Sequence, residues 1–98
     1  MNEAHPQKRT QIREEVRFPI TYSCSFEDRG EMKNLTKKGI SLNLSSGGIC
    51  IYTSVRFDPN TMLDISGKSA WNGFRRGSVR WCRQITEDLF RVGIRFMN

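Results

Sequence analysis

Two clusters of polar residues in this 98-residue chain have the types and spacing that suit an anionic ligand carrying a base. The first cluster holds Arg13 and Arg17, four positions apart and directly before the apolar segment that begins at Phe18. Their guanidinium groups can form paired hydrogen bonds with phosphates or with the O6/N7 edge of a guanine. The second cluster, residues 43–48, reads Asn-Leu-Ser-Ser-Gly-Gly. Its amide and hydroxyl can read the rest of a base edge, and its glycines let a ligand approach the backbone.

Each cluster also has a purely structural interpretation. Arginine and glutamate in residues 9–17 could form weak pairs on a single helical turn, each worth a few tenths of a kcal/mol. Asn, Ser and Gly are the commonest turn formers, so residues 43–48 also predict a tight turn. Both clusters together favour ligand contact, because they would converge on one site. Arg9, four residues before Arg13, forms an alternative arginine pair and could add a peripheral phosphate contact.

The composition limits the classes of protein to consider. The length corresponds to one domain, and the formal charge of +6 lies mostly from Lys68 onward. A basic surface suits a nucleotide, a nucleic acid or an acidic protein. The three cysteines are far apart and the single histidine lies in a polar segment, so reduced buried thiols are favoured over a metal site. No apolar stretch is long enough for a membrane span or a signal peptide, which predicts a cytoplasmic protein.

The apolar pattern predicts an all-β domain with six short strands and no sustained helix. Residues 1–12 are polar and predict a mobile arm, and residues 13–98 predict the folded domain. The first two strands are expected over residues 18–26 and 32–44 around a turn at Glu27–Gly30, with a bulge at Lys38–Gly39. Residues 49–53, 62–65, 78–83 and 90–96 predict four more strands. Six strands with regular turns favour a small closed antiparallel barrel, which has no exposed edge.

Four segments, in this order, resemble the PilZ domain family of bacterial cyclic di-GMP receptors. They are the Arg13/Arg17 pair leading into Arg17–Ile20, the Asn-x-Ser-x-x-Gly of residues 43–48, the Val-x-Trp of residues 79–81, and the Gly-Ile-x-Phe of residues 93–96. The resemblance covers roughly residues 9–96 and implies a split β-barrel. It implies cyclic di-GMP contacts from Arg13, Arg17, Asn43, Ser45 and Gly48, with secondary candidates Arg9, Ser46, Gly47 and Trp81.

The chain departs from the family pattern in two places. Family members often carry an arginine directly before the first motif arginine, and this chain has Ile12 there. In the family that extra arginine accompanies a paired, self-intercalated ligand, so one cyclic di-GMP per protomer is predicted here unless Arg9 restores the charge. The sequence also ends soon after the last expected strand, which predicts that the family's C-terminal helix is absent. Trp81 is expected in the core, because a strand tryptophan in a small barrel is usually buried. Arg80 and Arg83 are expected on a solvated face or in secondary phosphate contacts, and not as specific readers of a base.

The sequence therefore predicts a receptor and not an enzyme, since it contains no carboxylate dyad, nucleophile–histidine pair or metal cluster. No cofactor is expected beyond the ligand itself. In the predicted mechanism the arginine segment becomes ordered over the ligand and signals to a protein target. The alternatives are a small basic barrel that binds single-stranded nucleic acid, which the scattered aromatic residues disfavour, and a ligand-independent adaptor. No membrane partner is expected, and the predicted state is a monomer or a weak homodimer.

Overall fold

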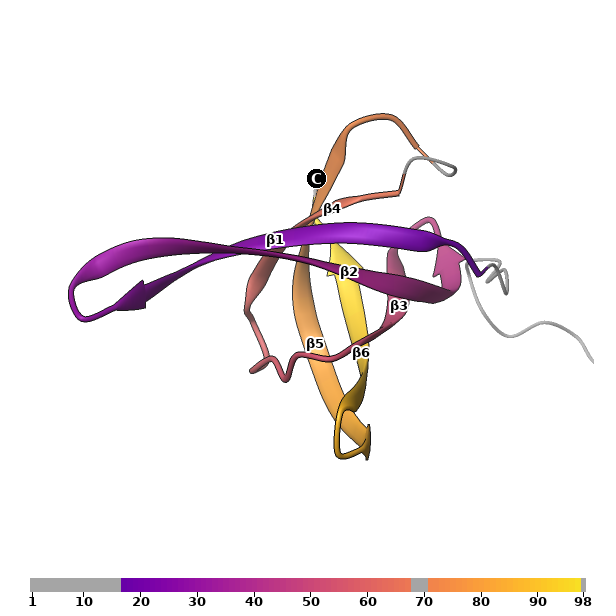
Figure 1. Ribbon diagram of the computed structural model, residues 1–98. Coiled ribbons are helices and arrows are strands. Elements are labelled where there is room, and N and C mark those ends of the chain that lie inside the picture. Colours follow the sequence, from indigo (N-terminus) through magenta and orange to yellow (C-terminus); the bar gives the residue numbers. More distant parts are fainter. Residues whose placement is uncertain (1–16, 68–70, 98) are drawn as a thin grey trace, which may run out of the picture.

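The computed structural model describes residues 17–67 and 71–97 and consists of six strands. These are β1 (Pro19–Asp28), β2 (Glu31–Ser45), β3 (Gly48–Thr53), β4 (Met62–Ser66), β5 (Phe74–Thr86) and β6 (Leu89–Phe96). They close into an antiparallel barrel in the order β1-β2-β3-β6-β5-β4 (Figure 1). The predicted six-stranded barrel is confirmed. Within the described ranges there is no helix, and hence none long and apolar enough to cross a membrane. The predicted mobile segment, residues 1–12, lies outside the described residues.

Alternating side chains of all six strands fill the barrel. The most deeply buried apolar side chains, each at most 2% exposed, are Ile20, Tyr22, Ile51, Leu63, Ile65, Val79 and Val92. Two buried hydroxyls have hydrogen-bond partners, as buried polar groups require. Ser41 accepts a bond from the backbone N–H of Phe18 at 2.9 Å, and Thr53 bonds to the Tyr22 hydroxyl. Burial raises the pKa of Tyr22, and the bond to Thr53 opposes that shift.

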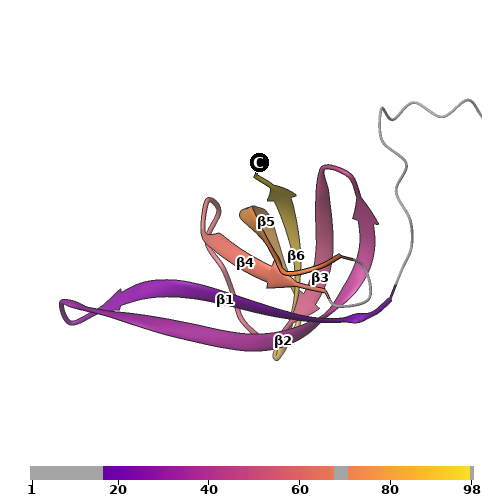
Figure 2. The same ribbon diagram turned by 90° about the horizontal axis from the view of Figure 1, so that it is seen from above.

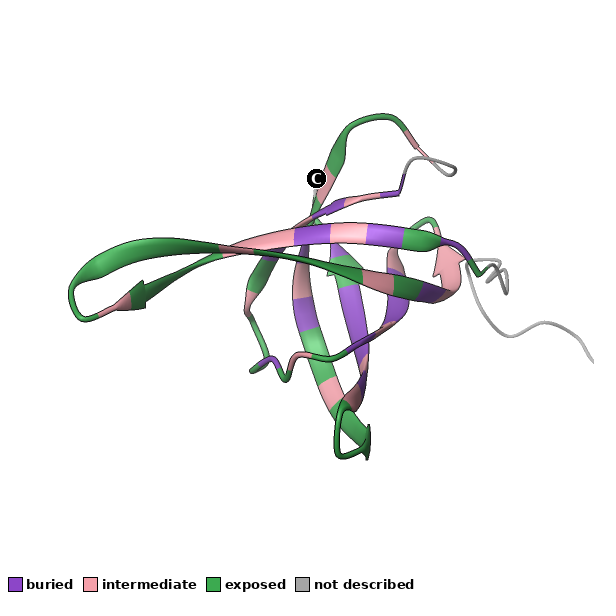
Figure 3. Ribbon diagram, in the orientation of Figure 1, coloured by how far each residue is buried: buried purple, intermediate pink, exposed green. Residues whose placement is uncertain are grey.

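The β1–β2 hairpin extends well beyond the barrel. β1 pairs with β4 only from Thr21 to Ser23, and β2 pairs with β3 only from Ile40 onward. Residues 24–38, called here the projecting hairpin, therefore stand away from the other strands (Figures 1 and 2). Its turn has positive φ at both Arg29 and Gly30, the geometry that matches the twist of a two-residue hairpin. Most of its residues are exposed (Figure 3).

Bulges interrupt the strand pairing at positions that the sequence did not predict. The prediction of a bulge at Lys38–Gly39 is wrong, because Gly39 pairs regularly with Ile20. Glycine is required there for a different reason: a Cβ would lie 2.7 Å from the Tyr52 carbonyl oxygen. The register of β2 shifts instead between Ser41 and Asn43, and that of β5 shifts between Val79 and Trp81. Both bulges border the candidate site.

Candidate functional site

Four residues form one row across four neighbouring strands of the barrel's outer surface. Asn43 of β2 pairs with Cys50 of β3, Cys50 pairs with Gly93 of β6, and Gly93 pairs with Trp81 of β5. The neighbours of Cys50 and Gly93 along their own strands point into the core, so alternation directs these two residues outward. The pairing of the strands thus unites two sequence motifs that are far apart in the chain.

The two bulges direct the side chains at the ends of this row, Asn43 and Trp81, toward the outer surface. An extra residue in one strand of a pair reverses which face the following side chains occupy. Ser41 is buried, and the extra residue Leu42 lets Asn43 reach the outer surface opposite Cys50. Val79 is likewise buried, and the extra residue Arg80 leaves both Arg80 and Trp81 exposed. Each bulge therefore turns outward a side chain that regular alternation would place in the core.

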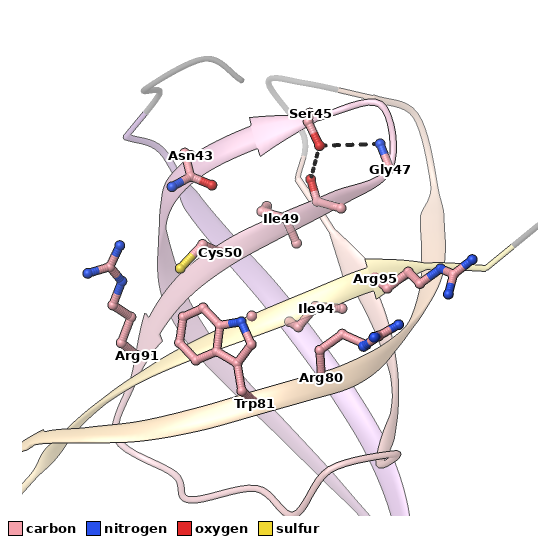
Figure 4. Close-up of a pocket in the computed structure, with 12 residues that line it drawn as sticks. Asn43, Ser45, Gly47, Ile49, Cys50, Arg80, Trp81, Arg91, Ile94 and Arg95 are labelled. Carbon is pink, nitrogen blue, oxygen red and sulfur yellow. Dashed lines mark hydrogen bonds between the residues drawn. The ribbon is translucent and has the colours of Figure 1, made fainter. Parts of the chain in front are cut away.

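The row forms the floor of a shallow hollow of about 230 Å³ (Figure 4). Three arginines line it, and none of its lining residues is a carboxylate. The complete lining is Asn43, Ser45, Gly47, Gly48, Ile49, Cys50, Arg80, Trp81, Arg91, Gly93, Ile94 and Arg95. Three guanidinium groups without a compensating acid create a positive potential that favours an anion.

Trp81 lies over Gly93 and is 40% exposed, and Figure 4 shows its indole among the side chains that line the hollow. The expectation that Trp81 belongs to the core is therefore wrong. A Cβ on residue 93 would lie 2.3 Å from Cε2 of the indole, so only glycine permits this position of the ring. Arg83 flanks the same indole, with its guanidinium carbon 5.7 Å from the ring centroid. An exposed aromatic face beside arginines can stack on a nucleobase.

Arg91 and Arg95 come from the outward positions of β6 on either side of Gly93. Arg91 contacts Cys50, and this contact raises the pKa of Arg91 above its ordinary value. Its Nε is buried without a hydrogen-bond partner among the described residues. Arg91 and Arg95 were not identified as site residues from the sequence, and Arg80 was expected on a solvated face or in a secondary phosphate contact. The available signal was the alternation of arginine with Val92 and Ile94, because alternate residues of a strand share a face.

The turn between β2 and β3 holds the second predicted cluster. The Gly47 N–H donates to the Ser45 hydroxyl oxygen at 3.3 Å, and that hydroxyl lies 3.5 Å from the Gly48 carbonyl oxygen (Figure 4). Neither Gly47 nor Gly48 has positive φ. Gly48 is required by close packing, since a Cβ there would lie 2.3 Å from the Ile94 carbonyl oxygen. The structural interpretation of this cluster as a turn is thus correct, and the same turn forms one wall of the hollow.

The structure brings together only part of the predicted site. Asn43, Ser45, Gly47, Gly48 and Trp81 all line the hollow, whereas Ser46 is exposed and does not. Arg17 is exposed just before β1 and does not line it either. The bonds between Phe18 and Ser41 place Arg17 beside the β2 bulge, close to the Asn43 end of the row. Arg9 and Arg13 lie outside the described residues.

Metal binding has no support in the part of the chain that the structure describes. No group of three or more histidine, cysteine or carboxylate side chains there could hold an ion. The three cysteines are free thiols, and the expected burial holds for Cys50 but not for Cys24 or Cys82, which are half-buried. The groups that the hollow offers to a ligand are the three guanidinium groups, the Asn43 amide, the Ser45 hydroxyl and the face of the Trp81 indole.

Comparisons with known proteins identify the fold and the family. The chain is similar to the solved structure of the Bacillus subtilis inhibitor of motility, MotI/DgrA, with a TM-score of 0.62 and 15% sequence identity. The similarity covers 95% of this chain but only 44% of that one, and at this identity it shows the fold alone. Comparison with curated proteins gives no significant match. The family model described as the PilZ domain matches residues 11–98. The chain therefore belongs to the PilZ domain family.

Proposed function

We propose that this protein is a non-catalytic receptor for cyclic di-GMP, the ligand that PilZ domains generally bind. One observation carries the proposal: a single hollow without carboxylates joins the Asn43–Gly48 cluster to three arginines and an exposed indole. A cyclic dinucleotide needs cations for its two phosphates, an aromatic face for its bases and hydrogen-bonding groups for the guanine edges. All three kinds of group are present in the hollow.

The residues divide naturally among these tasks. Trp81 is the stacking surface for one guanine, because its face is exposed and Gly93 leaves room for the ring. Arg80, Arg91 and Arg95 bind phosphates or the O6/N7 edge of a guanine. The Asn43 amide can read a base edge, while the Ser45 hydroxyl has the additional task of holding the turn.

In this proposal Arg13 and Arg17 supply further contacts from the segment before β1. Arg17 already lies beside the β2 bulge at one end of the row. Ordering of this arginine segment over the ligand would change the outer surface of the barrel and signal occupancy to a protein target. We place the receptor in the cytoplasm, where cyclic di-GMP and such targets would be available.

Binding of single-stranded nucleic acid is less well supported. Barrels that bind single strands use several aromatic residues on one continuous face. Among the described residues the exposed aromatics Phe26, Phe74 and Trp81 lie on the projecting hairpin, at the start of β5 and in the hollow. They do not form one continuous stacking surface.

Isothermal titration with cyclic di-GMP tests the proposal, with GTP and a short single-stranded DNA as competing candidates. Trp81→Ala and Arg91→Ala should each weaken binding of cyclic di-GMP about ten- to a hundred-fold, since stacking and charge-assisted bonds are each worth roughly 1–3 kcal/mol. Arg13→Ala and Arg17→Ala should have effects of the same size. Arg76→Ala is the matched control, because Arg76 is exposed on β5 and bonds to Asp64 outside the hollow.

Two results would overturn the proposal. One is that the parent protein fails to bind cyclic di-GMP, which would favour a ligand-independent adaptor or, if the DNA bound, a nucleic-acid partner. The other is that Trp81→Ala and Arg91→Ala bind as well as Arg76→Ala, which would place the ligand elsewhere. The same titration gives the stoichiometry, for which one ligand per protomer is expected. If two bind, Arg9→Ala should return the ratio to one.

A further inference from the structure

The outer edge of β2 along the projecting hairpin has no strand beside it among the described residues. β2 pairs with β1 from Glu31 to Ile40, but it pairs with β3 only from Ile40 onward. The Ser41 N–H donates to the Phe18 carbonyl at 2.9 Å, so the odd-numbered residues of this segment face β1. Alternation then directs the N–H and C=O groups of the even-numbered residues, from Met32 to Lys38, toward the open side. These groups form a template for another strand.

The projecting hairpin gains little stability from its own contacts. A two-stranded hairpin is marginal in water unless it gains a third strand or a packed face. Here residues 24–38 extend past the other strands, and both Phe26 and Met32 are largely exposed, at 43% and 71%. A strand added to the open edge would give the hairpin the neighbour that it lacks.

The charges on β2 restrict which strand can be added. Asp28 near the turn is paired with Lys33 at 3.0 Å, but neither Glu31 nor Lys37 has an ion-pair partner within the described ranges. The hairpin is therefore acidic near its turn and basic toward the barrel. Lysines on an open edge repel most incoming strands. An added strand fits only if it sets a base against Glu31 and an acid against Lys37.

We propose that a second copy of this chain occupies the edge, with the two β2 strands antiparallel and the two-fold axis at Asn34. This register sets the Glu31 of each copy opposite the Lys37 of the other, twice in the assembly. In this register the backbone N–H and C=O groups of Met32 in one copy form hydrogen bonds with those of Thr36 in the other. Two neighbouring registers also keep the hydrogen bonding. With the axis at Lys33 the two copies of Lys33 would face each other, and with the axis at Leu35 Lys33 would face Lys37. Charge therefore selects the first register.

The same register extends the side-chain rows of the hairpin across the interface. Within one chain Phe26 lies opposite Lys33, and Cys24 lies opposite Leu35. Pairing about Asn34 sets Lys33 beside the second copy's Leu35, so one row runs Phe26, Lys33, Leu35, Cys24 across four strands. The aliphatic part of Lys33 then covers apolar surface while its charge remains with Asp28. The interface is small, so the dimer is expected to be weak and to form at high protein concentration.

A charge-swap experiment tests both the partner and the register. Sedimentation equilibrium up to millimolar protein should detect a dimer of the parent chain. Glu31→Lys and Lys37→Glu should each weaken it at least about tenfold, because each places two like-charged pairs in the interface. The double variant restores opposite charges and should dimerise as the parent does. Glu87→Lys, at the β5–β6 turn, is the control for the change in net charge.

Each other outcome overturns the proposal. If the parent stays monomeric throughout, a second copy does not occupy this edge. A double variant that fails to restore the dimer shows that Glu31 and Lys37 do not meet. Stronger dimerisation of Lys37→Glu would indicate the register with its axis at Leu35. These results do not depend on the nucleotide hollow, and a failure of cyclic di-GMP binding would leave them unchanged.

Discussion

The hollow and the projecting hairpin are both polar outer surfaces of the same small barrel, but their strands have different support. In the hollow, β3 and β6 have a strand on each side, and bulges fix the direction of Asn43 and Trp81. In the projecting hairpin each strand has one neighbour, and most of its side chains are exposed. The first arrangement holds groups in fixed positions for a small ligand, whereas the second leaves backbone groups available for another chain.

The largest loss of stability should come from a substitution at the contact between β3 and β6, which supports the hollow. In Gly48→Ala the new Cβ would lie 2.3 Å from the carbonyl oxygen of Ile94 on β6. Backbone cannot move aside as a side chain can, so β3 and β6 must separate locally. We expect a loss of about 3 kcal/mol or more in the free energy of unfolding, measured with urea.

Ser46→Ala is the matched control for this prediction. Ser46 is exposed in the same turn and does not line the hollow, so its replacement should change stability by no more than about 0.5 kcal/mol. A Gly48→Ala protein as stable as Ser46→Ala would contradict the close approach of β3 and β6 at this position.

A change at Gly93 should affect the hollow while leaving the barrel intact. The three atoms nearest to the Cβ of Gly93→Ala would all belong to the indole of Trp81, which is partly exposed and can rotate away. We expect at most about 1 kcal/mol of lost stability. Affinity for cyclic di-GMP should fall about tenfold or more, as for Trp81→Ala, because the stacking surface has moved.

A spectroscopic measurement separates this prediction from the proposed function. In a Trp71→Phe background, iodide should quench the fluorescence of Trp81 more strongly after Gly93→Ala, whether or not cyclic di-GMP binds. Unchanged quenching would mean that the indole does not lie over residue 93.

The sequence predicted the barrel well because the segments that line its core carry apolar residues at alternate positions and are bounded by turn residues. It did not predict the bulges. At residues 41–43 and 79–81 one extra residue changes the face of a side chain, and no local signal distinguishes this from regular alternation. Trp81 was therefore expected inside. The glycine that frees its ring, Gly93, lies on a different strand, so the reason for its exposure appears only after β5 and β6 are paired.

The candidate site was predicted in part for a related reason. Asn43, Ser45 and Gly48 are close in sequence and could be recognised as a cluster. Arg91 and Arg95 reach the same hollow through the pairing of β3 with β6, which sequence spacing does not reveal. The extent of the first two strands was predicted closely, but not that residues 24–38 project beyond the barrel, because this depends on where β4 and β3 pair with them.

The smallest effect on global stability should come from the hairpin's own ion pair. Lys33 Nζ lies 3.0 Å from Asp28 Oδ2, and both side chains are about half exposed. Such pairs contribute roughly 0.2–1 kcal/mol because water screens them. Lys33→Ala, studied at a concentration where the chain is monomeric, should therefore lower the free energy of unfolding by about 0.5 kcal/mol or less. Hydrogen exchange should show a larger local change, with faster exchange of amides in residues 24–38 and unchanged exchange in β3 and β6. If exchange in β3 and β6 accelerated equally, the hairpin would unfold together with the barrel, and the difference in support between the two regions would not exist.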